Sequence, residues 1–192
     1  GSLKGKGDGF LAKLSPDGKK LYFSTLLGGS GGENLLMPTI DDAGNVLVVG
    51  STGSSDFPVT PGALQAKHGG GEDGALAVLD ADGAKLLYSS YLGGRGDEVI
   101  RSIALGGAGE CYLVGSTDSG DFPASPGALQ GAHSGKGDAF LVKLAPKPFP
   151  LGEWISLFDG KTLDGWTVHT DRDYAHLYGK AAASDGKIAL EA

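Results

Sequence analysis

A 65-residue repeat is the feature that most constrains the fold of this chain. Asp8, Asp73 and Asp138 follow one another at this interval, and each precedes a short apolar stretch. A repeat of this kind is one structural unit that buries its apolar face against its neighbours, so the sequence predicts a stacked array. Four further motifs recur at the same offset: Gly28-Gly29 as Gly93-Gly94, Gly50-Ser51-Thr52 as Gly115-Ser116-Thr117, Asp56-Phe57-Pro58 as Asp121-Phe122-Pro123, and Pro61 to Gln65 as Pro126 to Gln130.

Each repeat is expected to contain four short β-strands. Turn motifs separate its apolar segments, first Ser15-Pro16-Asp17-Gly18, then Gly28-Gly29, then Asp42-Ala43-Gly44-Asn45. Pro38 indicates an edge strand or a bulge, because proline cannot donate to a strand ladder. The continuous apolar run from Val46 to Val49 indicates a strand buried on both faces. In the first repeat the predicted strands cover residues 10–14, 20–27, 35–40 and 46–49.

Glycine is unusually abundant, at 35 of 192 residues, against an average of ~7%. Glycines between short apolar runs are typical of an all-β chain with many tight turns. Four strands per repeat match the blade of a β-propeller. The predicted fold class is therefore all-β, with a partial β-propeller over residues 1–145. It would comprise two full four-stranded blades plus the first strand of a third.

Closure of such a propeller needs more than this chain supplies, because propellers close with about 4–8 blades. An open pair of blades exposes strand edges, which invite pairing with other chains. Two explanations follow: the chain is a piece of a longer protein, or several copies assemble into a ring.

A long connection, residues 53–71 in the first repeat, closes each unit. Thr60-Pro61 predicts one helical turn, and Phe57 and Leu64 are predicted to pin the connection to the sheet. Structural packing of this segment is the favoured interpretation, and a ligand-binding surface is the alternative. In that alternative, the candidate ligand-binding residues are Asp56, Phe57, Asp121 and Phe122.

These motifs resemble the bacterial SBBP family of β-propeller repeats over residues 5–145. The resemblance implies a propeller within a large, usually exported bacterial protein, and hence an extracellular or cell-surface location. It implies no reaction, because the family has no established catalytic residues. The second repeat departs at Gly107 and Glu110, which weakens a metal-binding role for that turn. The matching segments are Gly7-Asp8 with Phe10-Leu11 and Lys13-Leu14, Leu26 with Gly28-Gly29, Asp42 with Gly44-Asn45, Gly50-Ser51-Thr52, and Asp56-Phe57-Pro58.

The sequence changes character after residue 145. Residues 146–152 contain several prolines and predict an extended linker, and residues 153–192 no longer follow the repeat. The run from Leu157 to Trp166 resembles the opening of the 3-keto-disaccharide hydrolase domain. This resemblance implies the start of a concanavalin-like jelly roll and sugar-related chemistry. Trp166 is a candidate for stacking on a sugar ring, although a core position is the favoured interpretation.

Charge and composition disfavour several other functions. The formal net charge is -7, whereas nucleic-acid binding needs clustered Lys and Arg. No apolar run approaches the ~18 residues that indicate a membrane span. Cys111, the only cysteine, is predicted to be a buried and unreactive strand residue. His68 recurs as His133, and the sequence leaves the role of both open.

The leading functional hypothesis is a non-catalytic interaction scaffold of an exported or surface bacterial protein, associated with carbohydrate binding. Carbohydrates or other surface proteins are its expected partners. The rival hypothesis is an accessory part of a hydrolase acting on 3-keto-disaccharides or glycosides. No catalytic residue, metal site or cofactor is assigned, because the sequence contains no Walker loop, CxxC pair or HExxH motif.

Overall fold

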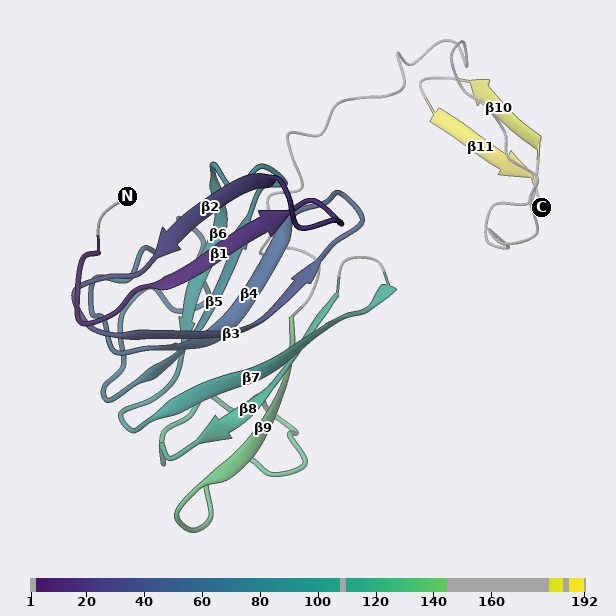
Figure 1. Ribbon diagram of the computed structural model, residues 1–192. Coiled ribbons are helices and arrows are strands. Elements are labelled where there is room, and N and C mark those ends of the chain that lie inside the picture. The colour runs from purple at the N-terminus through teal and green to yellow at the C-terminus, as the bar shows by residue number, and fades with distance from the viewer. Residues whose placement is uncertain (1–2, 108–109, 145–179, 185–186, 192) are drawn as a thin grey trace. The chain divides into compact units, whose positions relative to one another are not determined.

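The computed structural model describes residues 3–107, 110–144, 180–184 and 187–191, and these contain strands but no helix. Two compact units divide the chain, residues 1–150 and 151–192. The strands of the first unit, drawn from purple to green in Figure 1, are β1 (Gly9–Leu14), β2 (Leu21–Leu27), β3 (Glu33–Ile40), β4 (Val46–Thr52), β5 (Asp73–Leu79), β6 (Leu86–Leu92), β7 (Glu98–Leu105), β8 (Cys111–Thr117) and β9 (Asp138–Leu144).

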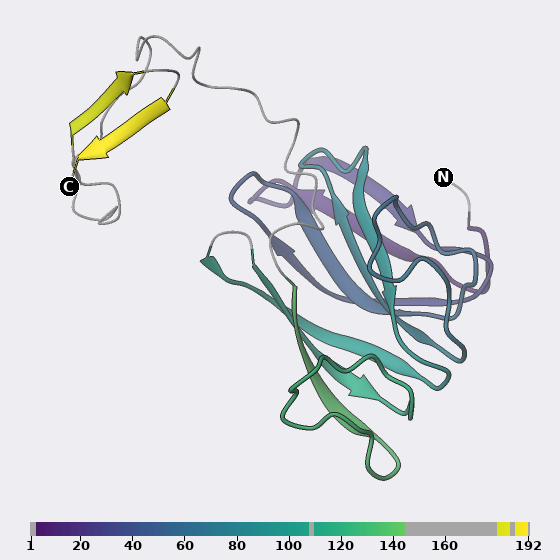
Figure 2. The ribbon, with the colours of Figure 1, turned by 180° about the vertical axis from the view of Figure 1, so that it is seen from behind.

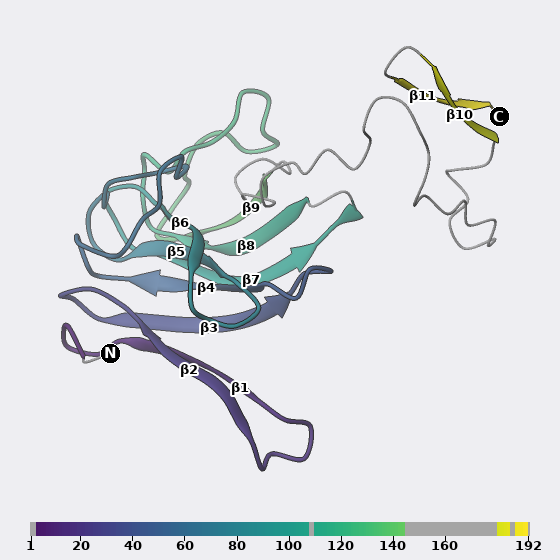
Figure 3. The same cartoon turned by 90° about the horizontal axis from the view of Figure 1, so that it is seen from above.

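Three antiparallel sheets make up the first unit. They have the strand orders β1-β2, β3-β4-β5-β6 and β7-β8-β9. Figure 3 shows the β1-β2 hairpin set apart from the other strands, next to β3. Strand β7 packs against β3, β4 and β5, and β1 contacts β3. The all-β prediction is confirmed, and the predicted strands of the first repeat agree closely with β1 to β4. None of the described sheets closes on itself.

The predicted grouping of strands into blades is wrong, because the boundaries between the sheets are shifted by two strands along the chain. The one four-stranded sheet combines β3 and β4 of the first repeat with β5 and β6 of the second. Strand β4 pairs with β5 without a bulge, from Val46 opposite Leu79 to Thr52 opposite Asp73. Meanwhile Gly28-Gly29 leads from one sheet to the next. The described part of the first unit therefore holds two, four and three strands, in place of two full blades and one further strand.

The predictions for the third and fourth strands are confirmed. Strand β3 lies at the edge of its sheet, and its register shifts between Leu35 and Met37, next to Pro38. All seven residues of β4 are buried, because the two faces of its sheet contribute to two different apolar clusters. Leu47 and Val49 belong to the cluster shared with β7 to β9, and Val48 belongs to the cluster shared with Leu27 of β2.

The turns follow the sequence closely, with one correction. Gly18 and Gly44 take the left-handed backbone conformation, with φ of 71° and 83°, as their turn positions require. The helical turn predicted after Thr60 is instead a type II β-turn. The Ala63 N–H donates to the Thr60 carbonyl at 3.1 Å, and Gly62 has a φ of 83°. Glycine in the third position of a turn favours this conformation over a helix.

The second unit is described only by the hairpin of β10 (Lys180–Ser184) and β11 (Lys187–Glu191). Its register runs from Lys180 opposite Glu191 to Ser184 opposite Lys187. The linker 146–152, the jelly-roll motif and Trp166 lie outside the described residues.

Candidate functional site

The Gly-Gly motifs mark two junctions between successive sheets, which are built from the same contacts. At the second junction, Glu98 of β7 is fully buried. Its Oε2 accepts from the Gly94 N–H at 2.8 Å, and its Oε1 accepts from Thr117 Oγ1 at 2.5 Å. The Glu98 N–H donates to the Glu72 carbonyl at 2.6 Å. The glutamate thus ties the Gly-Gly loop to strand β8 and to the residue preceding β5.

The first junction repeats this arrangement around Glu33 of β3. Glu33 accepts from the Gly29 N–H at 3.2 Å, from Thr52 Oγ1 at 2.8 Å, and from Ser54 Oγ. The Glu33 N–H donates to the Gly7 carbonyl at 2.9 Å. Sequence reasoning missed this pair of glutamates. Their 65-residue offset was the signal that could have identified them.

Asp73 and Asp138, at equivalent positions of the repeat, each accept hydrogen bonds from the long connection that precedes them. Asp73 Oδ2 accepts from the Gly69 N–H at 2.7 Å and from Gln65 Nε2 at 3.0 Å. Gln65 Oε1 accepts from the Gly93 N–H at 2.9 Å, so one glutamine links the connection to the second junction. Asp138 accepts from Gln130 Nε2 and from the Ser134 N–H in the same way, at 2.8 and 2.6 Å.

Asp73 differs from the other acidic residues in its electrostatics. Its side chain is fully buried, and Oδ1 has no hydrogen-bond partner among the described residues. Burial raises the pKa of this carboxyl above its ordinary value of 3.8. The Gly69 N–H and the charge of His68 oppose the rise in pKa, and the negative charge of Glu98 adds to it.

The predicted ligand residues Asp56 and Asp121 each hold the loop after a Gly-Gly motif. Asp56 Oδ1 accepts from the Ser30 N–H at 2.7 Å and from Ser30 Oγ at 2.8 Å. These bonds hold the pKa of Asp56 below its ordinary value. Asp121 accepts from the Arg95 N–H at 2.9 Å and forms an ion pair with the Arg95 side chain at 3.4 Å.

The predicted residues Phe57 and Phe122 pack against aromatic rings. Phe57 is buried, with its ring centroid 6.0 Å from that of Tyr91. Phe122 is half-buried and stacks on Phe140 at 4.7 Å. The prediction that Phe57 pins its connection agrees with this burial. The same prediction for Leu64 is wrong, because Leu64 is 58% exposed.

The two long connections also contain the two repeated histidines, His68 and His133. The second connection is drawn in green in Figure 2. His68 Nε2 lies 3.3 Å from the Thr52 carbonyl oxygen, and its ring meets Tyr91 edge-on at 5.5 Å. His133 Nε2 is buried without a hydrogen-bond partner among the described residues.

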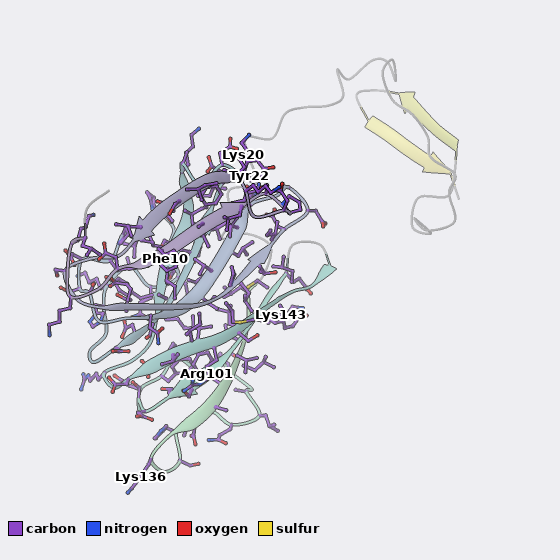
Figure 4. All side chains as sticks on the ribbon, viewed as in Figure 1. Phe10, Lys20, Tyr22, Arg101, Lys136 and Lys143 are labelled. Atoms are coloured by element: carbon purple, nitrogen blue, oxygen red, sulfur yellow. The ribbon has the colours of Figure 1, made fainter. Side chains whose placement is uncertain are left out.

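A shallow pocket of about 570 Å³ lies between the β1-β2 hairpin and the turn after β5. Lys13 Nζ donates to the Ala81 carbonyl at 3.3 Å across it. Lys20 Nζ lies 5.1 Å from the ring centre of Tyr22, and Figure 4 labels both side chains at this end of the hairpin. Sequence reasoning missed this pocket, and adjacent aromatic residues beside a lysine-rich turn were the available signal. It is lined by Lys13, Tyr22, Phe23, Ala81 and Asp82.

Two further observations limit the chemistry of the described part of the chain. Cys111 is buried, as predicted, and burial raises the pKa of its thiol to about 11, which disfavours a reactive thiolate. Among the described residues, no three His, Cys, Asp or Glu side chains come together as a metal-binding group.

The described residues include no helix that is long and apolar enough to cross a membrane. No protein-family model matches the sequence, and no curated protein matches it significantly.

Proposed function

We propose that residues 1–145 are part of a β-propeller that serves as a non-catalytic interaction scaffold, associated with carbohydrate binding, in an exported or surface bacterial protein. The observation that carries the proposal is the repeated junction. Two successive boundaries between sheets use the same glutamate, glycine and threonine contacts. A construction that repeats in this way can be extended by further blades.

The use of the acidic side chains supports a scaffold rather than an enzyme. Glu33, Glu98, Asp56 and Asp121 all accept hydrogen bonds from loop N–H groups or hydroxyls within the chain. A catalytic acid or base must instead lie within hydrogen-bond reach of a substrate. Because these carboxylates organise loops, their recurrence is explained by folding.

The exposure of β1 and β2 supports extension by further repeats. Phe10 is 71% exposed, whereas Ala75 and Phe140, at the same repeat position, are 1% and 8% exposed. Figure 4 shows Phe10 labelled on the β1-β2 sheet. Exposed apolar surface of this kind marks an interaction site. Either a longer parent chain or further copies of this chain would cover it, and a mass measurement in solution separates these alternatives.

We assign carbohydrate binding to the shallow pocket beside Tyr22. The Tyr22 side chain is 51% exposed, and an exposed aromatic face suits the apolar face of a sugar ring. Lys13 and Asp82 line the same pocket and offer one donor and one acceptor group for sugar hydroxyls. The pocket thereby combines an aromatic platform with polar groups, as saccharide recognition requires.

A glycan array probed with the full 192-residue chain tests this proposal. Binding to at least one glycan is expected, with a loss of about tenfold or more in Tyr22→Ala, which corresponds to ~1.4 kcal/mol. Tyr112→Ala is the matched control, because Tyr112 also lies near a lysine, with Lys143 Nζ 5.4 Å from its ring centre. Absence of binding to every glycan, or equal losses in both variants, would contradict the carbohydrate assignment.

The alternative function is an accessory role in a hydrolase acting on 3-keto-disaccharides or glycosides, favoured by the motif from Leu157 to Trp166. Turnover of a 3-keto-glycoside by the longer parent protein, but not by this chain, is its expected signature. Hydrolysis by residues 1–192 alone would contradict the non-catalytic assignment.

A further inference from the structure

Two buried carboxylates face the same glycine at the second junction. A Cβ atom built on Gly93 would collide with Glu98 Oε2 and with Asp73 Oδ1, so these two oxygens border the same small space and are at most about 5 Å apart. Both side chains are 0% exposed. At the first junction, a Cβ atom on Gly28 would meet Glu33 Oε2 and Asp8 Oδ1 in the same way. Glycine at these positions therefore leaves room for a pair of acids.

The hydrogen bonds of the pair leave one oxygen unsatisfied. Both oxygens of Glu98 accept bonds, from the Gly94 N–H and from Thr117 Oγ1. Asp73 Oδ2 accepts two bonds, but Asp73 Oδ1 is buried and has no partner among the described residues. A buried polar atom without a hydrogen-bond partner destabilises the folded state. The oxygen without a hydrogen-bond partner therefore belongs to the aspartate and lies on the side that faces Glu98.

The surrounding charges do not neutralise the pair. Among the described residues, His68 is the group whose charge acts to lower the pKa of Asp73, against the effects of burial and of Glu98. Glu72 and Asp97 lie at the same junction but have other partners. Glu72 Oε2 accepts from Ser51 Oγ at 2.9 Å, and Asp97 Oδ1 accepts from the Glu72 N–H at 2.8 Å. Two ionised carboxylates that share one buried site are strongly disfavoured.

We propose that Asp73 and Glu98 form a proton-binding site, in which one proton resides on Asp73 Oδ1 and is donated to Glu98 Oε2. The proton satisfies the unpartnered oxygen and removes one of the two buried charges, as in other carboxylate pairs that share a site. A metal ion fits less well, since the pair offers only one oxygen that is not already hydrogen-bonded. This proton links β5 to β7 and therefore joins two adjacent sheets.

The consequence for stability follows from the raised pKa of Asp73. Its contribution is fully present below the ordinary pKa of 3.8 and declines as the pH rises through the higher folded-state value. Carboxyls with lowered pKa, such as Asp56, act in the opposite direction. The contribution of the pair is therefore isolated by the difference in melting temperature between a variant and the wild type.

Asp73→Asn in the full chain is the decisive variant. The amide oxygen can accept the bonds from Gly69 and Gln65, and the amide N–H₂ can donate to Glu98 without a bound proton. We expect the variant to melt a few degrees above the wild type at pH 8, as a gain of ~1 kcal/mol would give, with the difference shrinking towards pH 4. Infrared spectra over a pH series should show a protonated-carboxyl C=O band that persists above pH 3.8 in the wild type and is missing from the variant.

Three further variants keep the test specific. Glu98→Gln should melt below the wild type at every pH, because both Glu98 oxygens already accept bonds. Asp8→Asn should repeat the Asp73→Asn pattern weakly, because Asp8 is only half-buried. Asp138→Asn is the matched control: the same loop contacts are present, but the residue 25 positions later is Leu163 rather than glutamate. The difference in melting temperature between Asp138→Asn and the wild type should not increase with pH.

Two outcomes would overturn the proposal. One is an Asp73→Asn variant that is destabilised equally at every pH and shows no loss of a carboxyl band. The other is stabilisation of the wild type by Ca²⁺, Mg²⁺ or Na⁺ at pH 8 that disappears in Asp73→Asn, which would assign the site to a cation. Neither outcome depends on glycan binding, so the scaffold proposal stands or falls separately.

Discussion

Strands β1-β2 and β5-β6 occupy the same positions of two successive repeats, yet they have different surroundings. All seven residues of β5 are buried, whereas most of β1 is exposed. Strand β5 pairs with β4 on one side and β6 on the other, but among the described strands β1 pairs only with β2. The comparison teaches that burial in this array depends on the neighbouring strands and sheets, not on the local sequence of a repeat.

Truncation of two equivalent leucines should give the largest difference in stability between the two pairs of strands. Leu79 is 5% exposed and Leu14 is 55% exposed. Leu79→Ala should lower the free energy of unfolding by about 2–5 kcal/mol, as for other buried leucines, and Leu14→Ala by less than about 0.5 kcal/mol. Urea denaturation measures both. Equal losses would mean that another copy of the chain covers β1 in solution, which the molecular mass would reveal.

Removal of the two junction glutamates tests the same comparison and should give a smaller difference in stability. Glu98→Ala leaves the Gly94 N–H and the Thr117 hydroxyl without their acceptor in a buried site, at a cost of about 1–3 kcal/mol. Glu33→Ala should cost less, because Glu33 is half-buried and water can replace it. Thermal unfolding of the two variants gives the order. A larger loss for Glu33→Ala would show that burial does not set the strength of the junctions.

The connection turns should behave alike in the two repeats. Gly62 and Gly127 have φ of 83° and 79°, and a Cβ atom at either position would meet no atom within 4 Å. Substitution by alanine therefore acts only through the left-handed backbone conformation and should cost about 1–2 kcal/mol at each site. Chemical denaturation of Gly62→Ala and Gly127→Ala checks this. Clearly unequal losses would indicate that tertiary contacts contribute to one of the turns.

The smallest effect is expected at Lys13 and Lys143, which occupy the same position of the repeat. Lys143 forms an ion pair with Glu110, and this contact lowers the pKa of Glu110. Lys13, at the same repeat position, donates to the Ala81 carbonyl instead. Lys143→Ala should raise the pKa of Glu110, as followed by NMR titration, and Lys13→Ala should leave it unchanged. The melting temperature should not change measurably, since exposed ion pairs contribute little.

Local features were predicted well because their causes are local. Gly18 and Gly44 set their turns by taking a conformation that other residues avoid. The run from Val46 to Val49 predicted an inner strand, and the burial of Phe57 followed from an apolar residue in a polar connection. Glu33, Glu98 and the unpartnered oxygen of Asp73 were not found. Their significance depends on distant partners, because Thr52 lies 19 residues from Glu33, Thr117 lies 19 residues from Glu98, and Glu98 lies 25 residues from Asp73. No local pattern reveals such pairs.

The sequence by itself determined the repeat, the positions of the strands and most of the turns. Only the tertiary structure decided which strands share a sheet. Backbone hydrogen bonds are chemically the same between any two strands, so a strand sequence does not name its partner. The pairing of β4 with β5 goes with the burial of all residues of both strands, and the carboxylates of Glu33 and Glu98 join each sheet to the next.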